Sequence, residues 1–181
     1  ALVVVPTREL AMQIDQATEG FGYYTGVSSL AIYGGGSGKE FSREKKALQQ
    51  GADVVIVTPG RMLSHLNLGY VDLSELEFLI LDEADRMLDM GFYQDIMRIA
   101  SHCKKQRQTL LFSATMPEKM RRLAHDLLID PVTVQLALSK PAENVKQSAY
   151  VVFDYQKDDV LVDILKKKKV ESGIIFTSRK K

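Results

Sequence analysis

The sequence lacks tryptophan and has a single cysteine, Cys103, among its 181 residues. One cysteine excludes a disulfide within the chain, and it favours a reducing compartment such as the cytoplasm. Cys103 continues a helical spacing of apolar residues that begins at Phe92, which predicts a packing role for it in the core. The three histidines lie far apart without the spacing of metal ligands, so surface or packing roles are expected for them.

The chain also lacks a strong charge of either sign and any long apolar run. Its 24 Lys and Arg and 23 Asp and Glu give a net charge of +1, which excludes a grossly basic protein but not a local basic surface. No apolar run reaches membrane-spanning length, and the first residues lack the basic flank of a signal peptide. No membrane association is therefore expected, and the composition is that of a soluble globular protein.

Short apolar segments alternate with segments of helical periodicity, which predicts a parallel α/β sheet with flanking helices. Apolar stripes at spacings of three and four run from Leu10 to Phe21, from Met116 to Leu127 and, more weakly, from Leu161 to Lys168. Core packing is the expected use of each stripe. The strands are expected at Leu2–Pro6, Leu30–Tyr33, Asp53–Thr58, Phe78–Asp82, Thr109–Ser113, Val132–Gln135, Ala149–Phe153 and Ile174–Thr177.

The periodicity stops over residues 136–147, which contain Ser139, Lys140 and Pro141. This composition predicts a linker between a first domain over residues 1–135 and a second domain over residues 148–181. The first residue is not Met, and strands are expected close to both ends of the chain. We therefore expect the sequence to be an internal segment of a longer protein.

The segment 78–85 is the most informative, because four apolar residues lead directly into Asp82, Glu83 and Asp85. Ligands of open α/β sheets bind beyond the carboxyl ends of the strands. At that edge Asp82 could hold Mg²⁺, directly or through water, beside phosphate groups. Glu83 could orient or deprotonate a water that attacks a phosphoryl group. The alternative is that these acids only favour the start of a helix.

Four further motifs follow expected strands, so all five fall at the same edge of the sheet. They are Pro6-Thr-Arg-Glu-Leu10, Gly34-Gly35, Thr58-Pro-Gly-Arg61 and Ser113-Ala-Thr115. Each of them taken alone could be a helix cap or a turn. The three that contain glycine or arginine suit phosphate binding, because glycines let main-chain N–H groups approach a phosphate and arginine offers it a fork of donors.

In this order the five motifs resemble those of the DEAD-box ATP-dependent RNA helicases of superfamily 2, bacterial members included. The resemblance spans nearly the whole chain. It implies a RecA-like first domain without the strand that carries the P-loop, and the start of a second RecA-like domain. It also implies RNA-stimulated ATP hydrolysis coupled to local unwinding of RNA duplexes, with ATP as the substrate and Mg²⁺ as the cofactor.

The resemblance assigns roles to individual residues. Asp82 would bind Mg²⁺ on the ATP phosphates, through water, and Glu83 would position the attacking water. Asp85, Ser113 and Thr115 would link the hydrolysis site to domain closure by hydrogen bonds. The residues that would contact RNA are Thr7, Arg8, Gly34, Gly35, Thr58, Gly60 and Arg61. Because such contacts go to the backbone, RNA binding should be independent of base sequence.

The glycine-rich segment Gly34–Glu40 looks like a P-loop but departs from its pattern. That pattern needs Gly where Tyr33 stands and Ser or Thr where Glu40 stands. A tyrosine has a steric cost at positive φ, and a carboxylate would repel phosphates. The P-loop is therefore expected upstream of Ala1, and the 181-residue chain alone is expected to be inactive.

Two other functions fit parts of the sequence. A DNA-directed helicase or translocase of the same superfamily is one, but Asp85 and the Pro6–Leu10 motif count against it. The other is a short protein that binds RNA or a partner without ATPase activity, which the missing P-loop would fit. No feature of the sequence identifies a protein partner.

Overall fold

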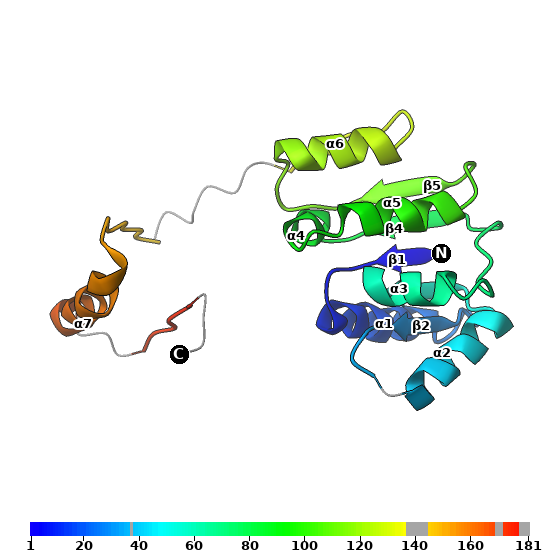
Figure 1. Ribbon diagram of the computed structural model, residues 1–181, viewed down its shortest axis with the longest axis horizontal. Helices are drawn as coiled ribbons and strands as arrows, with labels where there is room; N and C mark the ends of the chain where they lie inside the picture. The colour runs from blue at the N-terminus through cyan, green and yellow to red at the C-terminus, as the bar shows by residue number, and fades with distance from the viewer. Residues whose placement is uncertain (37, 137–144, 169–171, 178–181) are drawn as a thin grey trace. The chain divides into compact units, whose positions relative to one another are not determined.

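The computed structural model describes residues 1–36, 38–136, 145–168 and 172–177 (Figure 1). It divides into two compact units, Ala1–Val132 and Thr133–Lys181, which are described separately. The linker predicted at 136–147 falls largely on residues 137–144, which lie outside the described residues. The assignment of domains on either side of it stays a prediction.

The first unit is built on a sheet of five parallel strands in the order β2-β3-β1-β4-β5. The strands are β1 (Leu2–Val4), β2 (Ser29–Ile32), β3 (Val54–Val57), β4 (Phe78–Leu81) and β5 (Gln108–Leu111). The parallel α/β class is thereby confirmed, with five of the eight predicted strands in place. Because every strand runs the same way, all five carboxyl ends lie at one edge.

Six helices connect or follow these strands. They are α1 (Arg8–Gly22), α2 (Gly38–Gln50), α3 (Pro59–Leu66), α4 (Ala84–Asp89), α5 (Tyr93–His102) and α6 (Glu118–Leu127). Thr7 caps α1, since its Oγ1 accepts the Leu10 amide at 3.3 Å. Pro59 occupies the first position of α3, where a missing N–H costs nothing. Since α4 begins within Asp82–Asp85, three of the five motifs also start helices.

The core lies on both faces of the sheet, because neighbouring residues of a strand point to opposite sides. Val4 and Leu81 belong to the larger apolar cluster, with Ile96 of α5. Val3 belongs to the smaller cluster, with Ala11 of α1. The sheet is thus held between α1 on one face and helices that include α5 on the other.

Two of the predicted apolar stripes extend further than the core does. Phe21 is 86% exposed, because the packing of α1 against the smaller cluster ends at Ile14. Met116 lies before α6 and is 45% exposed. Core packing was therefore the wrong prediction for these two residues. The packing role predicted for Cys103 is confirmed, since only 7% of it is exposed.

The second unit contains a single 3₁₀ turn, η1 (Asp154–Gln156), and one helix, α7 (Lys157–Lys168), within the described residues. The strands predicted at Val132–Gln135, Ala149–Phe153 and Ile174–Thr177 do not form, so those predictions were wrong. A strand needs a neighbour to pair its main-chain groups, and the described residues provide none there. Across the described chain, no helix has the length and apolar character needed to cross a membrane.

Candidate functional site

The strand order places the candidate residues in two adjacent groups along the carboxyl edge of the sheet. Asp82–Asp85 and Ser113–Thr115 follow β4 and β5, which are neighbours. The other group follows β2, β3 and β1, which also lie side by side in the sheet. Its members are Gly34–Gly35, Thr58–Arg61 and Thr7–Arg8. The edge therefore has one acidic half and one half that is rich in glycine and arginine.

The acidic half is built on a tight turn between β4 and α4. The Asp82 amide still pairs with the Val4 carbonyl at 3.0 Å, as in the sheet. Asp82 Oδ1 then accepts the Glu83 amide at 2.9 Å. Glu83 has φ 48° and ψ 47°, a left-handed conformation that is uncommon for any residue except glycine. Such strain is typical of functional sites, and here it places two successive carboxylates at the sheet edge.

Hydrogen bonds from Thr115 connect the turn after β5 to α4. The Thr115 amide and Oγ1 donate to Asp85 Oδ2 at 3.0 and 2.7 Å, and Ser113 Oγ donates to the Thr115 carbonyl at 2.6 Å. Burial opposes the charge of Asp85, but hydrogen bonds from Thr115 and from the Arg86 amide help to outweigh it and hold the pKa of this carboxyl below its ordinary value. Asp85 is therefore an ionised acceptor at neutral pH.

The acidic half fits a Mg²⁺ ion that is shared with a phosphate. Asp82 Oδ2 has no hydrogen bond among the described residues, whereas Oδ1 is used by Glu83. Within the same residues, no group of three His, Cys, Asp or Glu side chains could hold a metal ion. Mg²⁺ needs no such group, because it is usually bound by one or two carboxylates together with substrate phosphates and water. Asp82 fits that pattern.

Glu83 forms an ion pair with Arg86, with Oε2 and Nη1 3.1 Å apart. The two side chains are 44% and 58% exposed. An exposed pair of this kind contributes little to stability, so it does not lock the carboxylate in place. Glu83 can therefore turn toward a ligand at low cost.

In the other half, Arg8 is held above the ring of Tyr33. Its guanidinium lies 4.9 Å from the ring centroid, within the range of a cation–π contact. Tyr33 directly precedes the glycine pair, and Gly35 has φ 93°, which a residue with a side chain rarely adopts. The contact brings the first motif next to the glycine turn, although β3 separates their strands.

Arg61 has a partner that the sequence did not predict. Its Nε donates to Glu44 Oε2 at 2.7 Å, and its side chain is only 14% exposed. Glu44 lies on α2 and also contacts His65, which is fully buried on α3. The four-residue spacing of Arg61 and His65 on one helix face was the available signal. Nothing in the sequence indicated that α2 would supply the carboxylate.

His65 stacks on Phe41 with ring centroids 4.2 Å apart, and its Nδ1 contacts the Tyr70 hydroxyl. Burial lowers the pKa of His65 and outweighs the opposing effect of Glu44, so the ring is neutral at pH 7. A carboxylate can only accept, so His65 Nε2–H donates to Glu44 at 2.9 Å. Nδ1 is then the acceptor of the Tyr70 hydroxyl.

The lowered pKa of His65 predicts a pH dependence of stability. The unfolded histidine takes up a proton near pH 6.5, whereas the folded one does so only at lower pH. The stability that the neutral His65 ring contributes is therefore complete above about pH 6.5. It is lost as the pH falls from there through the lower pKa of the folded state. We expect the melting temperature to fall between about pH 7.5 and pH 5.5. The fall should be smaller in His65→Gln, and equal slopes by calorimetry would contradict the assignment.

The described residues of the segment Gly34–Glu40 do not have the geometry of a P-loop. α2 begins at Gly38, and the Glu40 carboxylate lies so close to Gly36 that a side chain there would collide with it. A carboxylate thus already stands at the helix N-terminus where a phosphate would bind. Ser37 lies outside the described residues. The geometry supports the prediction that this segment is not a P-loop.

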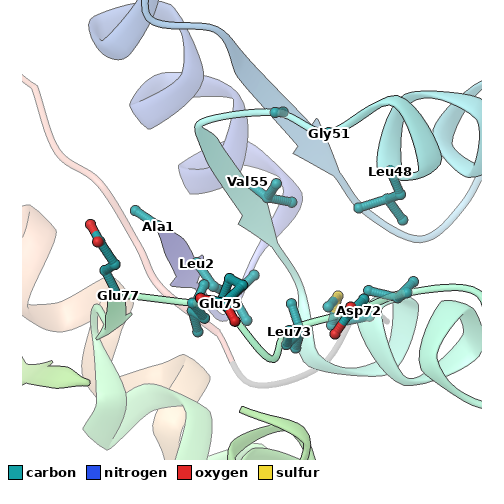
Figure 2. A pocket seen from close by; sticks show the side chains of 13 residues that line it. Ala1, Leu2, Leu48, Gly51, Val55, Asp72, Leu73, Glu75 and Glu77 are labelled. Carbon is teal, nitrogen blue, oxygen red and sulfur yellow. The ribbon is translucent and has the colours of Figure 1, made fainter. Parts of the chain in front are cut away.

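A pocket of about 280 Å³ lies at the opposite edge, by the start of β1 (Figure 2). Its lining includes Leu2 and Val55 as well as Glu75 and Glu77, which Figure 2 labels. None of the predicted site residues lines this pocket. It is therefore separate from the candidate site.

Comparisons with known proteins point to one family. The family model described as DEAD/DEAH box helicase matches residues 1–123. A Haemophilus influenzae protein named ATP-dependent RNA helicase DeaD is 40% identical over 181 residues, which are 99% of this chain and 29% of that protein. The mouse protein named ATP-dependent RNA helicase DDX42 is 47% identical over 148 residues, or 81% of this chain and 16% of that protein.

A solved structure is similar as well. It is titled as a hypothetical ATP-dependent RNA helicase from Sulfolobus tokodaii and is 38% identical, with a TM-score of 0.65. The match covers 71% of this chain and 38% of that one. The chain therefore spans well under half the length of the proteins that it matches here.

Proposed function

Because this chain belongs to the DEAD/DEAH box helicase family, we propose that the protein is an ATP-dependent RNA helicase. RNA-stimulated ATP hydrolysis would be coupled to local unwinding of RNA duplexes. The observation that carries the proposal is the strand order, which sets the acidic turn beside the glycine- and arginine-rich half of the same sheet edge. Residues 1–135 would form the first RecA-like domain and residues 148–181 the start of a second, and the single cysteine supports a cytoplasmic location.

ATP hydrolysis is assigned to the half of the edge that follows β4. Glu83 would orient the attacking water and take its proton, which its exposed carboxylate can reach by turning away from Arg86. Asp82 would hold Mg²⁺, through water, on the ATP phosphates. When bound, this ion neutralises charge that develops on the phosphates.

Coupling between hydrolysis and movement is assigned to Asp85, Ser113 and Thr115. Their hydrogen bonds join α4, which begins at the hydrolytic turn, to the segment after β5. A displacement of the turn on ATP binding would be passed to that segment through the Asp85–Thr115 contacts. These hydrogen bonds support the role proposed for the three residues in domain closure.

RNA binding is assigned to the half of the edge that follows β2, β3 and β1. The backbone of RNA would be contacted by Thr7, Arg8, Gly34, Gly35, Thr58, Gly60 and Arg61. Glycine-containing turns expose main-chain N–H groups, and arginine binds phosphate through parallel hydrogen bonds. Contacts of this kind do not read bases, so binding should tolerate any RNA sequence.

Assays on the full-length protein test the proposal directly. Phosphate release from ATP should rise when single-stranded RNA is added, and a short RNA duplex should be separated only with ATP and Mg²⁺. The second candidate is RNA binding without ATPase activity, favoured by the lack of a P-loop pattern within the 181 residues. RNA binding with no ATP turnover by the full-length protein would support that candidate and contradict the helicase.

A substitution of Arg8 or Arg61 by alanine should weaken RNA binding to a similar degree for all sequences. Each lost phosphate contact should lower the slope of log affinity against log salt by about 0.7 on a single strand. Titration of labelled oligouridine and a mixed-sequence RNA at several salt concentrations measures both effects. If the slope stayed the same in both variants, the two arginines would have only a structural role.

A further inference from the structure

Arg61 is fixed from two sides. Its guanidinium carbon lies 4.5 Å from the centroid of the Phe41 ring, and its Nε is bound by Glu44 at 2.7 Å. Its Nη2 is buried and has no hydrogen-bond partner among the described residues. Both known contacts come from α2, whereas Arg61 itself lies on α3. The side chain is therefore oriented by another helix and retains an unused donor.

The partner of Arg61 is itself held in place. One oxygen of Glu44, Oε2, accepts from both Arg61 and His65. The His65 ring is fully buried, stacked on Phe41 and bonded to Tyr70 on its other nitrogen. A carboxylate with two donors on one oxygen has little freedom to rotate. A cation, Lys45, also lies beside this cluster, with its Nζ 4.9 Å from the centre of the Tyr70 ring.

We infer that Glu44 is a positioning residue for RNA binding, which holds Arg61 so that its unused donors can meet a backbone phosphate. The inference rests on the RNA contact proposed for Arg61. Glu44 binds the Nε side of the guanidinium, whereas the buried Nη2 has no hydrogen-bond partner among the described residues. A phosphate oxygen that reached the buried Nη2 would also satisfy a donor that now has no partner.

The direction in which RNA affinity changes when Glu44 is replaced separates a positioning role from a purely electrostatic one. A carboxylate near the RNA surface repels phosphate, so its neutralisation should tighten RNA binding if charge were its only role. If Glu44 positions Arg61, the length of the Glu44 side chain matters more than its charge. Glutamine keeps an oxygen at the same distance without the charge, whereas aspartate keeps the charge but is one methylene shorter.

The test compares Glu44→Asp and Glu44→Gln in the full-length protein by titration of labelled oligouridine at several salt concentrations. We expect Glu44→Asp to weaken binding and to lower the salt slope toward that of Arg61→Ala, by at most about 0.7. Glu44→Gln should bind close to wild type. Glu44→Asp combined with Arg61→Ala should bind no more weakly than Arg61→Ala alone, since the two residues act through one contact.

Thermal melts establish that each variant is folded at the assay temperature, and Glu19→Ala on the exposed face of α1 serves as the control for loss of one carboxylate. Tighter binding by Glu44→Gln with unchanged binding by Glu44→Asp would overturn the inference and leave the proposed function intact. Additive losses in the double variant would overturn it as well. If wild type bound RNA without salt dependence, the proposed function itself would fail.

Discussion

Replacing Glu83 by glutamine in the full-length protein is expected to lower the rate of ATP hydrolysis by about 10²–10⁴. Glutamine keeps the size of the side chain and suits the same turn, but it cannot take a proton from the attacking water. The substitution also removes the ion pair with Arg86, which is too exposed to affect stability much. ATP binding should therefore persist while turnover is lost.

Phosphate release with and without RNA measures turnover, and calorimetric titration with Mg·ATP measures binding. Glu75→Gln is a matched control, because Glu75 is 93% exposed and lines the pocket at the opposite edge of the sheet. Its turnover should equal that of wild type. Near-normal turnover by Glu83→Gln would exclude Glu83 from the mechanism.

The sheet could be predicted because its strands carry their own signal. β3 and β4 are short, continuous apolar runs, as expected for strands covered on both faces. The ends of both strands lie within one residue of the predicted bounds. The carboxyl edge followed from the parallel direction alone, so the motifs could be assigned to one edge without knowledge of the strand order.

The strands predicted at Ala149–Phe153 and Ile174–Thr177 show the limit of that signal. Apolar composition makes a segment suitable for a sheet, but pairing depends on a second strand elsewhere in the chain. In the described residues these segments have no such neighbour, and Val151 and Ile174 are highly exposed. Local sequence cannot report whether the neighbour is present.

The contacts of Arg61 were unpredictable for a related reason. The motif after β3 marked Arg61 as a phosphate ligand, but its ion pair with Glu44 joins residues 17 positions apart on two helices. That pairing depends on how α2 packs beside α3. Asp85 and Thr115, 30 positions apart, were expected to cooperate only because the family resemblance implied it.

The 181-residue chain by itself is expected to show no measurable ATPase activity and very weak ATP affinity. Its sequence has no Gly-x-x-x-x-Gly-Lys-Ser/Thr pattern, so it lacks the main-chain cradle and lysine that grip the β- and γ-phosphates. Asp82 and Glu83 would then have no substrate to act on. Calorimetric titration with Mg·ATP measures the affinity, and micromolar binding would contradict the prediction and restore Gly34–Lys39 as a candidate P-loop.

The same chain should also unfold with low cooperativity. β5 is the last strand of the sheet, and its outer edge has no partner strand among the described residues. Phe78 beside it is 40% exposed and Phe112 just beyond it is 53% exposed, so the apolar surface at this end of the sheet is incompletely covered. Open strand edges of this kind favour aggregation or non-native pairing. We therefore expect a broad thermal transition, with association of the chains at high concentration. A sharp transition that does not depend on concentration would contradict this and show that β5 needs no further partner strand.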